Sequence, residues 1–136
     1  FRAFRWTQAG GMINLGTLGG DYSMANAVSA DGSVVVGGAS TGANQVRAFR
    51  WKNGVMSSLG TLGGSGSSAY GVSGDGSVVA GNSQLAGDSA THAFRWTQAG
   101  GMTDLGTLPG GNWSYANKVS ADGTTIVGYG YINGGE

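Results

Sequence analysis

Residues 28–36 form the stretch Val-Ser-Ala-Asp-Gly-Ser-Val-Val-Val, and this stretch decides the fold. Asp-Gly favours a tight β-hairpin turn, because Asp bonds nearby backbone N–H groups and Gly adopts positive φ. The β-branched residues on either side favour strands. Three successive valines leave no polar face, so the strand that they form is expected to be covered on both sides. Close copies of the stretch occupy residues 72–80 and 119–127.

The hairpin stretch belongs to a repeated unit of 45 residues. Arg-Ala-Phe-Arg-Trp begins at positions 2 and 47, and His-Ala-Phe-Arg-Trp begins at position 92. Leu-Gly-Thr-Leu follows in each unit, at positions 15, 59 and 105. We therefore assign one repeat domain, residues 1–136, with repeats at 2–46, 47–91 and 92–136. A fixed period in this range predicts a stacked or radial repeat architecture.

Each unit predicts four short strands separated by turns rich in Gly, with no helical periodicity. The first strand precedes the Asp-Gly turn, the second follows it, the third holds Ala-Phe-Arg-Trp, and the fourth ends in Leu-Gly-Thr-Leu. The expected ranges are 25–29, 69–73 and 116–120 for the first strand, 33–37, 77–81 and 124–128 for the second, 2–7, 47–52 and 92–97 for the third, and 12–18, 55–62 and 102–108 for the fourth.

Four antiparallel strands in about 45 residues match the size of a propeller blade. The third strand alternates, placing Phe4 and Trp6 on one face and Ala3 and Arg5 on the other. A bulky face on one blade can then stack on a small face of the next. The predicted fold is all-β, a β-propeller-like array of four-stranded antiparallel blades, with three repeats and half blades at both ends.

Composition excludes several classes of function. The chain has 7 basic and 7 acidic residues, which argues against nucleic-acid binding and against a charged membrane-surface patch. No apolar run approaches the ~18 residues of a membrane span. Cysteine is absent, which excludes disulfides, cysteine nucleophiles and thiolate metal sites. Gly accounts for 29 of 136 residues and recurs at fixed unit positions, as tight turns and close sheet contacts require.

The repeated sequence motifs resemble those of a known family. The hairpin stretch is similar to the inner hairpin of WD40-type blades, although the Trp-Asp dipeptide of that family is missing. The chain more closely resembles the HAF repeat, a family of bacterial extracellular repeats. The motifs typical of this family are His-Ala-Phe, here His92-Ala93-Phe94, Ala-Phe-Arg-Trp, Leu-Gly-Thr-Leu-Gly-Gly and Ser-Ala-Asp-Gly. The resemblance implies extracellular or cell-surface localisation and supplies no catalytic residues.

The order of strands predicts incomplete sheets at both ends. The chain opens on a third strand and closes after a second strand, so each end carries a half blade with an unpaired edge. Two outcomes are expected. The half blades pair between copies, giving a homo-oligomeric ring or a filament, or the segment belongs to a longer array of blades.

Residues that occur in every unit are more consistent with scaffold than with an active site, which needs each group once. We assign Asp31, Asp75 and Asp122 to hairpin turns. The arginines after Phe are expected to lie over an aromatic ring or to bond neighbouring carbonyls.

The single histidine, His92, replaces an arginine of the other units and is expected to be a polar strand residue. The carboxylates outside the turns, Asp21, Asp88, Asp104 and Glu136, occupy different unit positions and indicate no facing pair. We therefore predict no enzyme activity, no cofactor and no metal site.

The longer connections, residues 19–24, 63–68, 110–115, 39–46 and 83–91, are expected to be loops on one side of the array, where binding sites usually lie. The predicted ligand-binding residues are Tyr22, Tyr70, Asn112, Trp113 and Tyr115. Aromatic rings with Asn suit sugar rings and hydroxyls, and they equally suit a seam between blades. The expected function is a non-catalytic surface module for scaffolding, adhesion or self-assembly, and the alternative is a carbohydrate-binding propeller.

Overall fold

The computed structural model describes residues 1–132, and it is all-β. Antiparallel strands form two four-stranded sheets and two two-stranded sheets, and a single 3-10 turn, η1 (Ala86–Asp88), precedes β9. The strands are β1 (Phe4–Thr7), β2 (Gly11–Asn14), β3 (Gly19–Val28), β4 (Val34–Thr41), β5 (Val46–Lys52), β6 (Val55–Ser58), β7 (Gly63–Val72), β8 (Val79–Leu85), β9 (Thr91–Thr97), β10 (Gly101–Asp104), β11 (Trp113–Val119) and β12 (Ile126–Tyr131).

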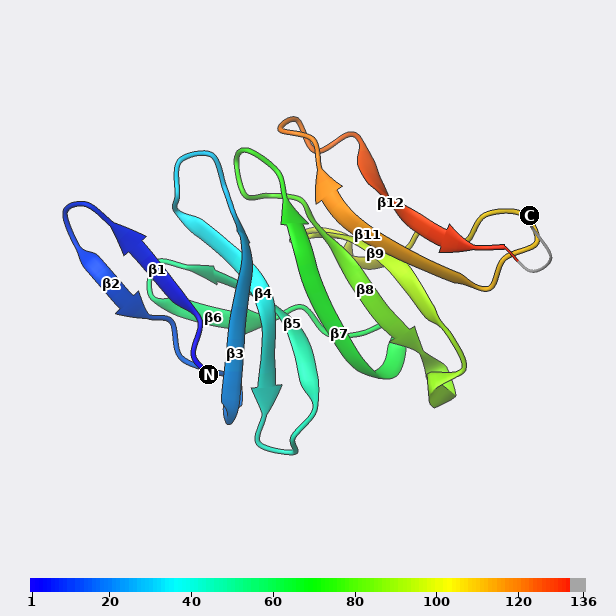
Figure 1. Ribbon diagram of the computed structural model, residues 1–136, viewed down its shortest axis with the longest axis horizontal. Coiled ribbons are helices and arrows are strands. Elements are labelled where there is room, and N and C mark those ends of the chain that lie inside the picture. The colour runs from blue at the N-terminus through cyan, green and yellow to red at the C-terminus, as the bar shows by residue number, and fades with distance from the viewer. Residues whose placement is uncertain (133–136) are drawn as a thin grey trace.

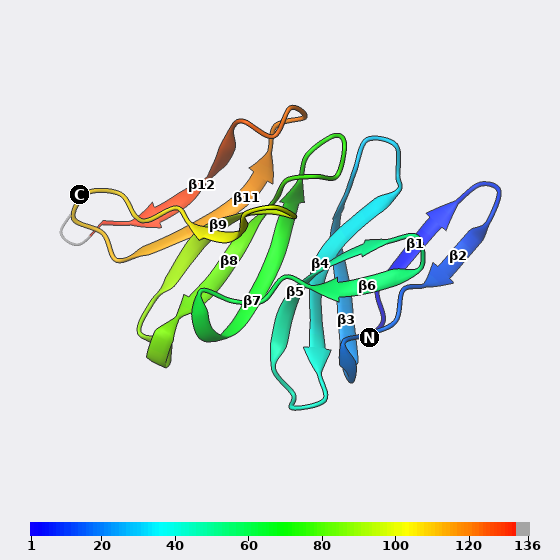
Figure 2. The same cartoon turned by 180° about the vertical axis from the view of Figure 1, so that it is seen from behind.

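The sheets stand side by side in chain order (Figure 1). Blade 1 has the order β3-β4-β5-β6, and blade 2 has the order β7-β8-β9-β10. The N-terminal half blade, β1-β2, and the C-terminal half blade, β11-β12, lie at opposite ends of the row, and the view from behind shows the same arrangement (Figure 2). The predicted array of four-stranded antiparallel blades with half blades at both ends is confirmed.

The Asp-Gly turns form as the sequence predicts. In the first turn, Asp31 Oδ1 accepts hydrogen bonds from the Ser33 backbone N–H at 3.0 Å and from the hydroxyls of Ser29 and Ser33 at 2.8 Å. Gly32 has φ of 76°, a conformation that glycine adopts without strain. The turns at Asp75 and Asp122 repeat these hydrogen bonds.

The hydrophobic core lies in the seams between blades. Val34, Val35 and Val36 are all buried, which confirms that the second strand is covered on both faces. Phe49 packs in the seam with the N-terminal half blade, whereas its neighbour Ala48 packs in the seam with blade 2. In the third strand, the bulky side chain therefore faces the preceding sheet and the small side chain faces the next sheet, as the alternation in the sequence predicts.

Close packing depends on glycine in the second strand. A Cβ atom on Gly37 would collide with the carbonyl of Met24 and lie 2.9 Å from the ring of Phe49. Gly81 meets the carbonyl of Ser68 and the ring of Phe94 in the same way. The third-strand phenylalanine thus lies across the glycine of the neighbouring strand, and a larger residue cannot be accommodated there.

Several predicted boundaries are wrong. Residues 19–24 and 63–68 are strand and not loop, because β3 begins at Gly19 and β7 begins at Gly63. The third predicted loop, 110–115, is also shorter than expected, because β11 begins at Trp113. The connections at 39–46 and 83–91 are shorter than expected, since β4 continues to Thr41 and β8 to Leu85. Most residues of these extensions are small or polar, above all Gly and Ser, so the extensions lack the apolar alternation that marks a strand in the sequence.

The fourth strands are shorter than predicted. They end at Asn14, Ser58 and Asp104, before Leu-Gly-Thr-Leu. The glycine of that motif has φ between 75° and 85° in all three units, and this left-handed conformation ends the strand. The leucines still reach the core, since Leu15 and Leu59 are buried.

Candidate binding surfaces at the open ends

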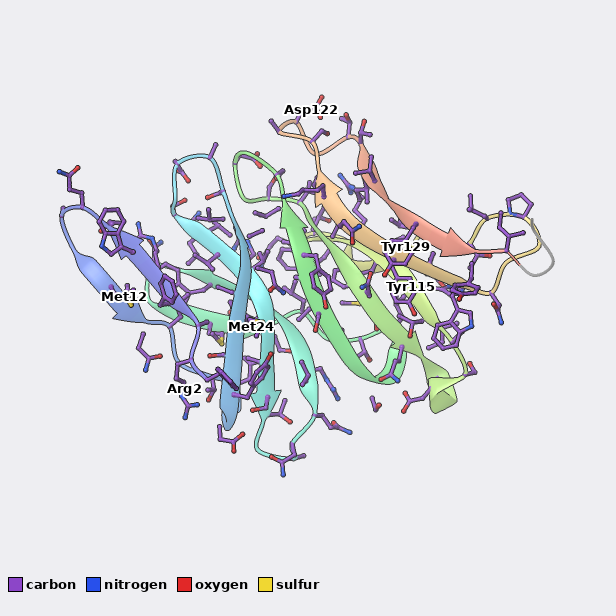
Figure 3. The ribbon with its side chains drawn as sticks, in the orientation of Figure 1. Arg2, Met12, Met24, Tyr115, Asp122 and Tyr129 are labelled. Carbon is purple, nitrogen blue, oxygen red and sulfur yellow. The ribbon has the colours of Figure 1, made fainter. Side chains whose placement is uncertain are left out.

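Four aromatic side chains gather on one face of the C-terminal half blade. Trp113 pairs with Tyr131 across β11 and β12, and Tyr115 pairs with Tyr129. The rings of Tyr115 and Tyr129 stack with centroids 4.9 Å apart and planes 19° apart (Figure 3). We call these four residues the aromatic ladder.

The aromatic ladder points away from blade 2. Ser114 lies between Trp113 and Tyr115, and its hydroxyl accepts a hydrogen bond from the Ala93 backbone N–H of β9 at 2.8 Å. Successive residues of a strand point to opposite faces, so Trp113 and Tyr115 point outward. Tyr129 is 59% exposed and Tyr131 is 67% exposed.

A cavity of about 410 Å³ lies on the aromatic ladder, lined by Asn112, Trp113, Tyr115 and Tyr131. It brings together three of the predicted ligand-binding residues. The other two lie elsewhere. Tyr22 lies on β3, and its ring meets the ring of Phe1 edge-on, with the ring centres 6.4 Å apart. Tyr70 lies at a register shift of β7, between Ala69 and Gly71.

Sequence reasoning missed Tyr129 and Tyr131. The prediction ended the second strand at residue 128, whereas β12 continues to Tyr131. The signal was present in the alternation Gly128-Tyr129-Gly130-Tyr131, which places both tyrosines on one face. The two tyrosines pair with Tyr115 and Trp113, so the site is built from both strands of the hairpin.

The opposite face of the same hairpin is also open. A cavity of about 270 Å³ lies there, between the C-terminal half blade and blade 2. Its lining comes from the Leu-Gly-Thr-Leu motif of the third unit and from residues of β9, β11 and β12. The lining includes Ala93, Leu105, Leu108, Ala116, Ile126, Gly128 and Gly130.

The N-terminal end carries a larger groove, about 470 Å³, between β1 and β3. Phe4 and Trp6 line it from β1, and Met24 and Val28 line it from β3. Phe4 is 53% exposed and Trp6 is 60% exposed, although the matching residues of blade 1, Phe49 and Trp51, are 0% and 7% exposed.

The repeated arginines connect neighbouring blades. Arg5 donates a hydrogen bond from Nε to the Gly32 carbonyl at 2.7 Å, and its guanidinium lies 5.6 Å from the ring centre of Trp51. Arg50 makes the same two contacts with Gly76 and Trp96. The prediction that these arginines bond carbonyls or cover aromatic rings is confirmed, and both contacts are made at once.

The acidic side chains of the turns and the single histidine, which could act in catalysis, make hydrogen bonds that hold the fold together. The three turn aspartates are held by backbone N–H and hydroxyl donors, which lower their pKa values to about 2 from 3.8. His92 Nδ1 lies 2.9 Å from Asp104 Oδ1, in a pair that joins β9 to β10. Among residues 1–132, no group of three or more His, Asp or Glu could hold a metal ion. Glu136 lies outside the described residues.

The part of the chain that the structure describes contains no helix with the length and hydropathy needed to cross a membrane.

Comparisons with known proteins bear on the fold. No family model matches the chain, and no curated protein matches it. Among solved structures, the chain is similar to TolB from Acinetobacter baumannii, with a TM-score of 0.67 and 17% sequence identity. The match covers 95% of this chain and 31% of that chain, so the chain spans about a third of TolB's length. TolB is a β-propeller, and the likeness shows a propeller-like fold alone.

Proposed function

We propose that this chain is a non-catalytic repeat module that associates through its open half blades and serves as a scaffold or adhesive element outside the cell or on its surface. One observation carries the proposal. Large apolar side chains that the complete blades bury are exposed at both ends of the row, as the comparison of Phe4 with Phe49 shows. The resemblance to HAF repeats supports the extracellular setting.

The size of the exposed area supports association. Full burial of a large apolar side chain stabilises a protein by ~1.5–3 kcal/mol. Phe4, Trp6 and Met12 are each more than half exposed at the N-terminal end. Covering the remaining surface of three such side chains therefore contributes about 3–5 kcal/mol, a large share of the ~5–15 kcal/mol that stabilises a domain.

The sparse chemistry of the chain supports a role without catalysis. The repeated polar residues hold turns and seams in every unit, and the aspartates of the turns are already bound by Ser or Thr. Adhesion and scaffolding need only exposed surface and association, both of which the open ends provide.

Light scattering coupled to size-exclusion chromatography tests the association. The expected result is a mass above that of one chain, 13.5 kDa, at micromolar concentration and a fall in mass on dilution. A stable monomer over a thousandfold range of concentration contradicts the proposal.

A second candidate function is carbohydrate binding at the aromatic ladder. The observation that favours it is the cavity of about 410 Å³ that joins Asn112 to Trp113, Tyr115 and Tyr131. Aromatic faces stack on sugar rings, and an Asn side chain both donates and accepts hydrogen bonds. A glycan array tests this function with the Trp113→Ala variant, and Tyr70→Ala is the matched control because Tyr70 lies on another strand. Loss of a bound glycan only in the Trp113 variant supports the site, and an array without binding removes it.

A further inference from the structure

We propose that a second copy of this chain completes each open half blade, with β12 of one copy pairing antiparallel with β1 of the other. The result is a hybrid four-stranded sheet of order β11-β12-β1-β2. The inference rests on the proposed function, to which it adds the partner and the register of the contact.

The complete blades supply the template for the register. In blade 1, β4 pairs with β5 so that Gly37 faces Phe49, and in blade 2 β8 pairs with β9 so that Gly81 faces Phe94. The matching glycine of the third unit is Gly128, whose Cα partner on β11 is Ala116. In the hybrid sheet, Gly128 therefore faces the second copy's Phe4.

The same register aligns the remaining positions. Val35 faces Trp51 and Ser40 faces Val46 in blade 1. The corresponding pairs of the hybrid sheet are Ile126 with the second copy's Trp6, and Tyr131 with the second copy's Phe1.

The cavity of about 270 Å³ has the lining that Phe4 requires. In blade 1, Phe49 packs in a cluster with Ala3, Leu15, Leu18, Ala25 and Ala39. The equivalent residues of the third unit are Ala93, Leu105, Leu108, Ala116 and Gly130, and all five line the cavity. The surroundings of a buried phenylalanine are thus present at the C-terminal end, and the phenylalanine that matches them stands on β1 of a second copy.

Exposure of the leucines supports this assignment. Leu15 is 6% exposed under blade 1, whereas Leu105 is 44% exposed at the C-terminal half blade. The difference arises because β11-β12 has no third strand beside β12 among the described residues. A phenylalanine on that strand covers the leucine, as Phe49 does in the seam that holds Leu15.

Arg95 supplies a second, separate match. Arg5 and Arg50 each bond the turn glycine of the next blade and cover its tryptophan. Arg95 Nη2 lies 3.4 Å from the Gly123 carbonyl, and no ring under its guanidinium is found within residues 1–132. The register places the second copy's Trp6 at that position.

The backbone of the Asp-Gly turns continues the pattern. Ala30 donates a hydrogen bond to the Gly74 carbonyl at 3.0 Å, and Gly74 donates to the Ala121 carbonyl at 2.9 Å. Since the second copy's blade 1 follows the hybrid sheet, the next donor is Ala121 and the next acceptor is the second copy's Ala30. Two copies joined at both ends give six sheets, within the range of about four to eight at which propellers close.

Engineered cysteines test the register, because the natural chain has none. Phe1→Cys and Tyr131→Cys are made in separate full-length chains, mixed and oxidised. Both residues are exposed, and cross-strand Cα separations of about 4.5–5.5 Å suit a disulfide. The expected product is a disulfide-linked dimer that contains one chain of each kind.

The matched control is Phe1→Cys mixed with Lys118→Cys. Lys118 is an exposed residue of the same hairpin, but it lies on β11, away from the pairing edge. The hybrid sheet predicts little linkage in the control mixture. Equal linkage in both mixtures, or linkage in neither, overturns the register.

Phe4→Ala tests the cavity without touching the core of a single chain, because Phe4 is half exposed there. We expect the dissociation constant of the association between copies to rise by about tenfold or more, with an unchanged circular dichroism spectrum. Val55→Ala is the control, because Val55 is an equally exposed apolar residue that lies on β6 of a complete blade. An unchanged dissociation constant in Phe4→Ala contradicts the assignment of Phe4 to the cavity.

The two proposals fail in different ways. Association without selective linkage leaves a self-assembling module but removes the hybrid sheet. A monomer at all concentrations removes both, and it then favours further strands of one longer chain as the occupant of the open edges.

Discussion

Each turn aspartate gathers three donors from the two serine or threonine residues that flank it. For Asp75 the strongest influence is the Ser77 backbone N–H, followed by the hydroxyls of Ser77 and Ser73, and together they lower its pKa to about 2 from 3.8. These hydrogen bonds favour the ionised carboxylate in the folded state. The stabilisation is therefore complete above the pKa of the unfolded chain and is lost as the pH falls through the pKa of the folded chain.

Asp75→Ala is expected to lower the melting temperature by a few degrees at pH 7, because the turn loses its acceptor. The difference from the natural chain should shrink as the pH falls from about 4 to about 2, where Asp75 itself becomes protonated. Thermal unfolding followed by circular dichroism at both pH values measures it. A difference that grows at low pH contradicts the assigned hydrogen bonds.

Gly81→Ala should destabilise the chain, since the added Cβ would collide with the Ser68 carbonyl and crowd the Phe94 ring. We expect a loss of about 1–3 kcal/mol in the free energy of unfolding, measured with urea. Gly42→Ala is the control because the nearest atom to its Cβ is 3.9 Å away and its φ is not positive. Equal losses at the two positions would contradict the role of the close approach, because at an unstrained position Gly→Ala restricts the unfolded chain and does not destabilise the fold.

At the scale of the element, the sequence predicts strands well where the residues are apolar and poorly where they are small. The apolar parts of the second strands and the Phe-Trp third strands lie where the sequence predicts them, because their side chains fill the seams. The extension of β7 through residues 63–68 was not foreseeable, since backbone hydrogen bonds and the buried Ser67 hydroxyl hold it without apolar side chains.

The third strand also links blades through its arginine. Arg50→Met is expected to cost about 1–2 kcal/mol in the free energy of unfolding, because it removes the bond to Gly76 and the contact with Trp96. Arg95→Met should cost less in the dissociated chain, since the bond of Arg95 is 3.4 Å long and no ring lies under its guanidinium within residues 1–132. Urea unfolding at low protein concentration compares the two. A larger loss at Arg95 would contradict the role assigned to the ring contact.

At the scale of the whole molecule, the sequence predicts the incomplete ends but not their details. Periodicity alone places the half blades, because each unit repeats the same strand order. The aromatic ladder depends on which residues face each other across β11 and β12. These cross-strand pairs can be assigned only when the end of β12 is known, and the sequence predicts that end too early. For this reason the sequence predicts Asn112, Trp113 and Tyr115, which line one cavity with Tyr131, but it predicts neither Tyr129 nor Tyr131.

Association of the chain should tolerate salt. The surfaces at the open ends are apolar, and the whole chain carries only 14 charged side chains among Lys, Arg, Asp and Glu, 7 of each sign. We expect the dissociation constant to change less than about threefold between roughly 0.1 and 1 M NaCl, or to fall, because salt screens charges but does not weaken apolar contact. Analytical ultracentrifugation at several salt concentrations measures it, and dissociation at high salt would indicate an electrostatic interface.

The line of hydrogen bonds from Ala30 to Gly74 to Ala121 has a consequence for evolution and engineering. It fixes the spacing of successive blades on the side of the Asp-Gly turns. The connections on the other side, residues 42–45 and η1, take no part in this line of hydrogen bonds, and they differ between units. On that side the sheets are linked by Arg2, which donates to the Asp21 carbonyl, and by Arg47, which donates to the Ser65 carbonyl. New peptide segments can therefore be inserted at those connections while the row of blades keeps its geometry, which makes that side of the molecule suitable for displaying diverse loops.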